Sequence, residues 1–408
     1  MSVPAATVTP TSAAERLQFH DLLRARLRLG AGPAIDLEPS SVQLDATDGG
    51  CWTVHISRDG RLSCSEGVHP HPTTTVRADL ATLSDVVSGR ESGVGAFLHG
   101  RILVRGNLAL SLQLDGVFEE SERPDRFPRS RTVMAAGIRT TYLEAGPPNA
   151  PVVVCLHGLG ATNASMLPTI WDLAGEHRVI APDLPGHGAS GKPHASYSAA
   201  WFGRWLRAFH EALGLEDVLL VGNSLGGRIA LEGGLLMPDR VRGMVLLAPS
   251  PAFRRLRQFV PLVRVLRPEM AALPLPMTHR LAVRGLRRMF AVPSRLPRQW
   301  YDAACDEFVR IFATRGGRVA FFSCLRQIYL EEAFGQDGFW TRLATLRPPA
   351  LFVWGEKDRL VPAGFARHVV EAVPHATSVV LANCGHVPQF ELPERTSQLV
   401  KNFLAELS

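Results

Sequence analysis

The chain has 408 residues, of which 46% are hydrophobic and 20% are charged, and its formal net charge is +6. This composition is typical of a folded globular protein and excludes extensive disorder, while the length favours two or three domains. The mild basic excess is not accompanied by a nucleic-acid-binding motif, which argues against nucleic acid as a partner.

The start of the chain predicts no targeting segment. Residues 1–20 lack a basic start followed by an apolar core, and the sequence contains no run of about 18 apolar residues. The six cysteines form no CxxC pair, so we expect reduced thiols and no metal site. We therefore expect a cytoplasmic protein without a cofactor, in which residues 1–13 form a flexible N-terminus.

Residues 14–118 predict a small α+β domain. A helix is expected over residues 14–29, because its leucines lie mainly on one side. The Asp59-Gly60 dipeptide between two alternating runs predicts a β-hairpin. The other expected elements are strands that begin near residues 42, 52, 61 and 73, helices over 80–88 and 93–98, and a strand over 102–104.

A charged segment with two prolines, residues 119–131, predicts a linker. After it, short apolar strands alternate with helices, a pattern that indicates a parallel sheet with helices on both faces. The predicted strands lie at residues 152–156, 179–181, 218–221, 244–248, 351–354 and 378–381. Residues 132–408 are therefore expected to form one α/β domain, interrupted by a helical cap at about 251–346.

The cap contains the most basic part of the chain. Between residues 251 and 300 there are eleven arginines and a single acidic residue, Glu269. An arginine-rich amphipathic helix attracts anionic membrane surfaces or negatively charged substrates, so peripheral membrane contact is one interpretation. The other is a lid whose apolar side covers an active site while the arginines solvate its outer side.

The strongest chemical signal is the segment GNSLGG, in which Ser224 directly follows an apolar strand. A serine on a sharp strand-to-helix turn needs glycines two residues away on both sides, here Gly222 and Gly226, since side chains there would clash. We therefore predict that Ser224 is a nucleophile at the carboxyl edge of the sheet. The simpler interpretation is a glycine-rich turn with an incidental serine.

A serine nucleophile needs a base, and the base needs an acid that orients it. Two later strands each lead into a loop with a suitable residue, Asp358 in GEKDRLVP and His386 in CGHVPQFELP. The order serine, acid, histidine is the one that this type of sheet requires. Glu356 is the rival acid, whereas residues 249–250, after another strand, offer no carboxylate.

Attack on an acyl group also needs two hydrogen-bond donors for the developing oxyanion. The backbone N–H of Leu225, at the start of a helix, is one expected donor. The second is expected at Leu159, in the HGLG loop after the first apolar strand of the α/β domain. His157 of the same loop is interpreted as structural.

The motifs HGLG at 157, DLPGHGAS at 183, GNSLGG at 222, GEKDRLVP at 355 and CGHVPQFELP at 384 resemble the α/β-hydrolase superfamily. The resemblance covers about residues 131–408 and implies that fold, with Ser224, Asp358 and His386 as the catalytic triad. Dehalogenases and epoxide hydrolases of the superfamily place an aspartate at the elbow, so Ser224 argues against both. The elbow also resembles that of carbon–carbon bond hydrolases, although these usually carry HGxGPG where this chain has HGLGAT.

Residues from about 14 to 118 resemble the sterol carrier protein type 2 family, above all from Thr73 to Leu114. The resemblance implies a shell of sheet and helices around an apolar tunnel, and hence a lipid or sterol ligand. The alternative is that this domain only stabilises, solubilises or dimerises the hydrolase. His69 and His71 are interpreted as part of a proline-rich loop, because no third metal ligand has a plausible spacing.

These features predict a metal-free serine hydrolase that cleaves an ester or thioester of an apolar acyl group through an acyl-enzyme. Carboxylesterase, lipase-like and thioesterase activities all fit the motifs. Two other hypotheses are a lipid carrier protein with a secondary hydrolase domain and a carbon–carbon bond hydrolase.

Overall fold

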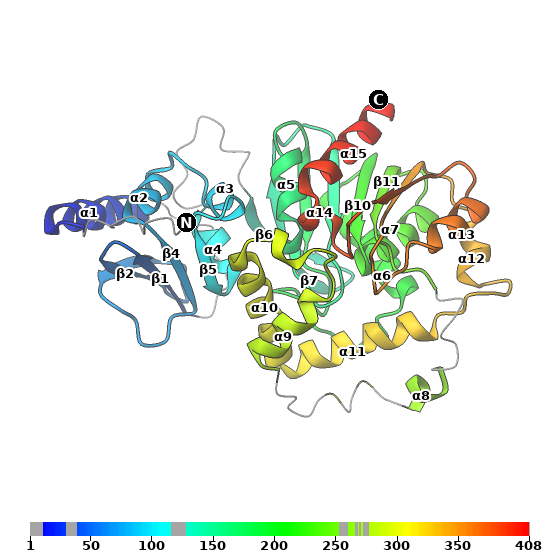
Figure 1. Cartoon of the computed structure of the whole chain (residues 1–408), viewed down its shortest axis with the longest axis horizontal. Coiled ribbons are helices and arrows are strands. Elements are labelled where there is room, and N and C mark those ends of the chain that lie inside the picture. The colour runs from blue at the N-terminus through cyan, green and yellow to red at the C-terminus, as the bar shows by residue number, and fades with distance from the viewer. Residues whose placement is uncertain are drawn as a thin grey trace, which may run out of the picture. The chain divides into compact units, whose positions relative to one another are not determined.

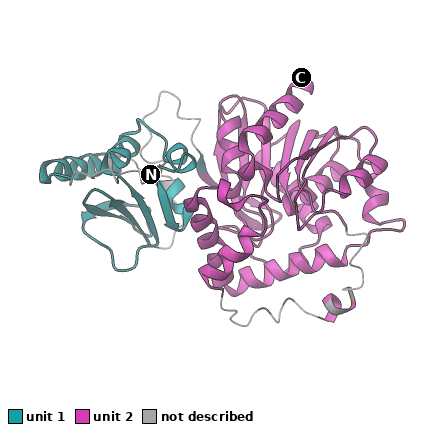
Figure 2. Ribbon diagram, in the orientation of Figure 1, with its two compact units in different colours: residues 1–129 teal, residues 130–408 magenta. Residues whose placement is uncertain are grey.

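The computed structural model in Figure 1 describes residues 11–29, 39–115, 128–252, 260–265, 268, 271 and 277–407. The chain divides into two compact units, residues 1–129 and 130–408 (Figure 2), and each unit is built on its own sheet. None of the described helices is both long and apolar enough to cross a bilayer. All six cysteines lie in described segments and are free thiols.

The first unit contains a five-stranded mixed sheet in the order β3-β2-β1-β4-β5, in which β1 runs antiparallel to β2 and parallel to β4. Its strands are β1 (Ser40–Ala46), β2 (Cys51–Ile56), β3 (Leu62–Glu66), β4 (Thr74–Ala78) and β5 (Leu103–Gly106). Its helices are α1 (Ala13–Leu29), α2 (Leu80–Ser88), α3 (Gly93–Leu98) and α4 (Leu108–Asp115).

Residue alternation along these strands gives the sheet an apolar face and a polar face. Val42, Leu44 and Trp52 are buried on the apolar face. Phe19 of α1 packs on Trp52, with 4.5 Å between the two ring centroids. The intervening positions, such as His55, are mostly polar and point to the opposite side. The core of this unit therefore lies between the apolar face and the helices.

Helix α1 begins with a reciprocal cap. Ser12 Oγ accepts a hydrogen bond from the Glu15 N–H (3.2 Å), and the Glu15 carboxylate accepts one from the Ser12 N–H (2.8 Å). Residues 1–10 of the expected flexible N-terminus lie outside the described residues. Residues 11–13 belong instead to this helix start, because the S-x-x-E pattern at 12–15 is a capping signal.

The second unit contains an eight-stranded sheet in the order β13-β12-β11-β10-β8-β9-β7-β6. The neighbours from β13 to β9 are parallel, and β7 joins β9 in antiparallel fashion. The strands are β6 (Arg129–Ala135), β7 (Ile138–Ala145), β8 (Val152–Leu156), β9 (Arg178–Pro182), β10 (Val218–Asn223), β11 (Val241–Leu247), β12 (Ala350–Gly355) and β13 (Thr377–Leu381).

Helices cover both faces of this sheet (Figure 1). Two glycines at the contacts with β11 show which helix lies on which face. A side chain at Gly234 of α7 would meet Met244, whereas one at Gly243 would meet Phe403 of α15. Since residues 243 and 244 point to opposite faces, α7 covers one face and α15 the other. The helices outside the cap are α5 (Leu167–Leu173), α6 (Ala199–Leu213), α7 (Leu225–Leu236), α13 (Phe365–Ala372), α14 (Pro388–Glu391) and α15 (Pro393–Glu406).

The α/β-hydrolase fold predicted from the sequence is confirmed, with one addition at the edge of the sheet. Strands β6 and β7 were not predicted, and β6 begins at Arg129, inside the expected linker. Residues 116–127 of the region around that linker lie outside the described residues. In the polar first half of β6, Arg131 forms an ion pair with Glu144 of the neighbouring strand β7. A largely exposed edge strand of this kind has no apolar run in its sequence.

The described part of the cap is helical. Its elements are α8 (Val260–Val265), α9 (His279–Arg287), the 3-10 turn η5 (Pro293–Arg295), α10 (Arg298–Ala313), α11 (Arg315–Leu330) and α12 (Phe339–Leu343). A buried ion cluster joins it to α7. Arg228, whose side chain is 2% exposed, pairs with Glu232 and with Glu331 at the end of α11, and Arg342 of α12 also pairs with Glu232. The cap is thereby anchored to the helix that follows Ser224.

Candidate active site

Ser224 lies on the turn between β10 and α7 and is partly exposed. Its backbone has φ 53° and ψ −113°, a region that residues other than glycine rarely adopt. Two hydrogen bonds hold the turn. The Ser224 N–H donates to the Leu247 carbonyl and the Ser224 carbonyl accepts from the Ser250 N–H, both at 3.0 Å. Hydrogen bonds to the end of β11 and to the loop after it thus hold Ser224, the predicted nucleophile, in this strained conformation.

The glycines around Ser224 are required by close backbone contacts. A Cβ at Gly222 would lie 2.5 Å from the Gly226 backbone, and a Cβ at Gly226 would lie 2.1 Å from the Leu156 carbonyl oxygen. Gly158 of the HGLG loop is also close, since a Cβ there would lie 3.4 Å from the Ser224 Cβ. The expected oxyanion loop therefore lies directly beside Ser224.

Asp358 and His386 form a buried hydrogen-bonded pair. The Asp358 Oδ2 lies 2.7 Å from the His386 Nδ1, and the two side chains are 0% and 3% exposed. The other carboxylate oxygen accepts hydrogen bonds from the N–H groups of Leu360 (2.8 Å) and Val361 (2.9 Å). Because the carboxylate is fixed at both oxygens, it holds the imidazole with Nδ1 as donor and Nε2 as the basic nitrogen.

The rival acid, Glu356, lies elsewhere. It is exposed, and its carboxylate accepts a hydrogen bond from the Asn383 N–H at 2.9 Å. This contact braces the loop that leads to His386. The structure therefore brings Asp358, and not Glu356, to the imidazole.

The residue before the nucleophile connects the elbow to the histidine loop. Asn223 Nδ2 donates to the carbonyl oxygens of His386 (3.1 Å) and Leu247 (3.0 Å). Both Ser224 and His386 are described, and the structure has no hydrogen bond between the serine hydroxyl and the imidazole. Catalytic hydrogen bonds of this kind often tighten only in the complex with substrate.

The cap holds the other side of the histidine loop. The His386 N–H donates to the Met289 carbonyl at 2.7 Å. The buried carboxylate of Glu391 accepts hydrogen bonds from the N–H groups of Gly385 (2.6 Å) and Val292 (2.8 Å), and so joins this loop to the cap. Neither this role nor that of Asn223 was predicted. Both residues stand within motifs that the sequence singles out, but nothing in a motif shows which backbone group a side chain will reach.

The two expected oxyanion donors are placed near Ser224. Leu225 is the first residue of α7, and Leu159 follows Gly158 in the loop after β8. Within the described part of the chain, neither backbone N–H donates to a protein acceptor. Two unpaired N–H groups beside a nucleophile, one of them at a helix N-terminus, are suited to a developing negative charge.

His157 organises this loop as a neutral, buried side chain. Its Nε2 accepts a hydrogen bond from the Leu184 N–H at 2.9 Å, so its Nδ1 carries the proton and donates to the Gly158 carbonyl at 2.8 Å. Burial lowers the pKa of His157 from 6.5 to about 4. The neighbouring His187, whose ring centroid lies 5.4 Å away, also has its pKa lowered by burial, to about 3.

We expect the free energy of unfolding to fall as the pH drops from about 7 to 4. The unfolded chain takes up a proton on His157 near pH 6.5 whereas the folded chain resists it until about pH 4, so this histidine removes up to roughly 3 kcal/mol of stability. Urea denaturation followed by tryptophan fluorescence at several pH values measures the slope. His157→Gln should flatten the slope, and the exposed control His375→Gln should leave it unchanged. Equal slopes in all three proteins would contradict the assignment.

Comparison with known proteins identifies the family. Residues 151–393 match the alpha/beta hydrolase fold family. The chain belongs to this family. Residues 28–119 match the SCP-2 sterol transfer family, so the predicted fusion of two domains is confirmed.

The similar proteins include hydrolases of different kinds. A 2-hydroxymuconate semialdehyde hydrolase of Pseudomonas putida is 30% identical over 300 residues, which cover 69% of this chain and 97% of that protein. An uncharacterised protein of Mycobacterium tuberculosis is 26% identical over 286 residues, covering 66% of this chain and 79% of its own. Among solved structures, a membrane phospholipase A described as a bacterial virulence factor has a TM-score of 0.59 at 25% identity, covering 80% of this chain and 96% of its own.

Proposed function

We propose that the protein is a serine hydrolase that cleaves an ester or thioester of an apolar acyl group through an acyl-enzyme. The observation that carries the proposal is the combination, at one edge of the sheet, of Ser224 on a strained elbow with the buried Asp358–His386 pair. The same edge holds the unpaired N–H groups of Leu159 and Leu225. These are the parts that acyl transfer to a serine needs.

The chemistry follows from these positions. The His386 Nε2 takes the proton of the Ser224 hydroxyl while the oxygen attacks the acyl carbon, and Asp358 stabilises the imidazolium. The two backbone N–H groups hold the oxyanion. The tetrahedral intermediate then expels the alcohol or thiol, which receives the proton from His386. Water, deprotonated by the same imidazole, releases the acid and regenerates Ser224.

An apolar acyl group is supported by the cap residues next to the oxyanion loop. Phe308 of α10 and Phe321 of α11 lie with ring centroids 5.8 Å apart. A Cβ at Gly160 would lie 2.8 Å from the Phe308 ring and 3.0 Å from the Phe321 ring. Aromatic side chains thus lie beside the oxyanion loop, where the acyl chain of a bound substrate would extend.

In the first unit, we propose a lipid or sterol as ligand, in keeping with its family. A lipid carrier with a secondary hydrolase domain stays an alternative, and lipid transfer that survives in Ser224→Ala would favour it.

Peripheral membrane contact through the cap is a further proposal. It is supported by Arg280, Arg284 and Arg287, which are exposed on α9. Of the other cap arginines, those at 254, 255, 257 and 267 lie outside the described residues.

A second candidate, carbon–carbon bond hydrolysis, is favoured by the relative at 30% identity. A vinylogous diketone substrate would detect it. The sequence of the oxyanion loop, in which Ala161 and Thr162 follow Gly160, differs from the HGxGPG pattern usual in such enzymes. Ester hydrolysis is therefore the first choice.

A chain-length series of 4-nitrophenyl esters and acyl-CoA thioesters, assayed with the full chain, tests the proposal. We expect kcat/KM to rise by up to roughly fourfold per added methylene until the apolar site is filled, because each buried methylene contributes about 0.8 kcal/mol. Turnover of the diketone that exceeds turnover of every ester would instead establish the second candidate.

A further inference from the structure

A buried carboxylate, that of Glu391, joins the cap to the loop that carries His386. Glu391 is the last residue of α14 and is 1% exposed. Its Oε2 accepts a hydrogen bond from the Gly385 N–H at 2.6 Å, and its Oε1 accepts one from the Val292 N–H at 2.8 Å. In the described part of the chain, no Lys, Arg or His side chain pairs with this carboxylate. Because a buried charge without a counter-charge is costly, the two charge-assisted bonds are what holds it in place.

The two segments that this carboxylate connects are in direct backbone contact. The His386 N–H donates to the Met289 carbonyl at 2.7 Å. A Cβ at Gly385 would lie 2.3 Å from the same carbonyl oxygen. The backbone of cap residues 289–292 therefore lies on the backbone of the histidine loop, residues 382–387, without room for a side chain between them.

Apolar side chains pack the same junction. Val387, in the histidine loop, belongs to a small buried cluster whose other members come from the cap, namely Phe290, Leu296 and Tyr301. Beside it, the ring centroids of Phe390 and Trp300 lie 5.1 Å apart. The bonds to Glu391 thus border an apolar junction, and in such surroundings a hydrogen bond is stronger than in water.

The imidazole of His386 is placed by the backbone that carries it as well as by its carboxylate partner. The His386 carbonyl accepts a hydrogen bond at 3.1 Å from Asn223, the residue before Ser224, which ties one side of the histidine loop to the elbow. The other side is tied to the cap through Met289 and Glu391. Without the bonds to the cap, the imidazole could move relative to the serine hydroxyl.

We propose that Glu391 is a positioning residue, which makes cap residues 289–292 a fixed part of the catalytic apparatus. It acts through the backbone of the histidine loop and does not touch the substrate. The cap cannot open at this end without moving His386 relative to Ser224, so the substrate enters past another part of the cap. The inference rests on the proposed hydrolase function, because its effect is exerted through His386.

The variant Glu391→Gln, studied in the full chain, tests this role. An amide keeps one acceptor oxygen but turns its NH2 group toward the other backbone N–H, so only one of the two bonds can form. We expect kcat for an apolar 4-nitrophenyl ester to fall by about a hundredfold, because a shift of about 1 Å in a catalytic group has an effect of that size. KM should change little, since the carboxylate bonds to backbone groups and not to the substrate. The matched control is Glu394→Gln at an exposed position of α15, which should retain full activity.

Two measurements that need no substrate separate positioning from a general loss of stability. In amide hydrogen exchange followed by mass spectrometry, peptides that contain residues 289–292 and 382–387 should both exchange faster in Glu391→Gln, whereas peptides from β10 and β12 should keep their protection. The low-field ¹H nuclear magnetic resonance signal of the His386 Nδ1 proton should shift in the same variant and stay in place in the control.

Three results would overturn the proposal. They are an unchanged kcat in Glu391→Gln, an unshifted proton signal, and a rise in exchange that is equal throughout residues 130–408, which would indicate that the variant only destabilises the fold. If the unaltered protein hydrolyses no ester or thioester, the proposed function fails. The exchange pattern and the proton signal then decide by themselves whether Glu391 positions His386.

Discussion

Replacing Ser224 by alanine is expected to lower kcat/KM for an apolar nitrophenyl ester by roughly 10⁴- to 10⁶-fold. The hydroxyl is the proposed nucleophile, and no other group replaces it. Alanine keeps the Cβ and the hydrogen bonds of the backbone at 224, so the fold should persist with an unchanged midpoint of thermal unfolding within a few degrees. Initial rates over a range of substrate concentrations give the two kinetic constants.

Ser250→Ala is the matched control for this measurement. Ser250 is a buried serine whose backbone N–H, which the substitution retains, donates to the Ser224 carbonyl. Its activity should stay within a fewfold of that of the unaltered protein. Ester turnover that survives in Ser224→Ala and fails in Ser250→Ala would show that Ser224 is not the nucleophile.

Replacing Asp358 by asparagine is expected to lower kcat for the same ester by roughly 10⁴-fold. The carboxylate accepts a hydrogen bond from His386 Nδ1, with 2.7 Å between nitrogen and oxygen, and an amide nitrogen in its place would favour the wrong tautomer of the imidazole. Glu356→Gln, which alters the rival acid two residues earlier in the same loop, should retain most of the activity. Comparable losses in the two variants would contradict the assignment of Asp358 as the orienting acid.

Three of the four strands that lead into the proposed active site could be predicted because they are buried on both faces; the fourth, β13, is partly exposed. β8, β10 and β12 are short and almost wholly apolar, so their positions stand out from the sequence. In a parallel sheet the loops after such strands meet at one edge. The placement of Ser224 and of the Asp358–His386 pair follows from this topology together with the spacing of glycines at the elbow.

The elements that could not be predicted have weaker local signals. The edge strand β6 is largely exposed and alternates irregularly, so it lacks the apolar run that reveals a central strand. Asn223 and Glu391 support the histidine loop through backbone groups that lie far away in the sequence. Such contacts depend on how loops from different strands approach each other, which local sequence patterns do not encode.

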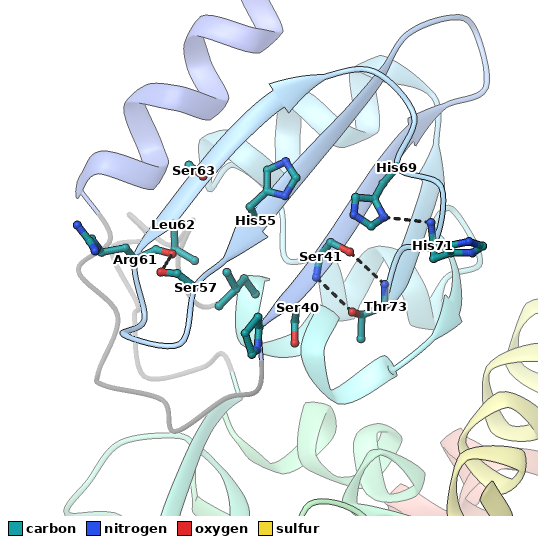
Figure 3. Close-up of a pocket in the computed structure, with 12 residues that line it drawn as sticks. Ser40, Ser41, His55, Ser57, Arg61, Leu62, Ser63, His69, His71 and Thr73 are labelled. Atoms are coloured by element: carbon teal, nitrogen blue, oxygen red, sulfur yellow. Dashed lines mark hydrogen bonds between the residues drawn. The ribbon is translucent and has the colours of Figure 1, made fainter.

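The loop between β3 and β4 of the first unit illustrates the same limit. The VHPHP segment suggests only a proline-rich loop when it is considered alone. In the fold, the buried Gln43 of β1 accepts a hydrogen bond from the His69 N–H and so fixes the backbone of this loop, whose His69 and His71 are shown in Figure 3.

Covalent trapping tests the central claim most directly. After incubation with a fluorophosphonate, intact-mass and peptide analysis should show one adduct per chain, located on Ser224 and absent from Ser224→Ala. The adduct should form much more slowly in Asp358→Asn, because the imidazole then no longer activates the hydroxyl. Ester hydrolysis that continues at full rate in a protein without this adduct, or an inactivating adduct on another residue, would contradict the account.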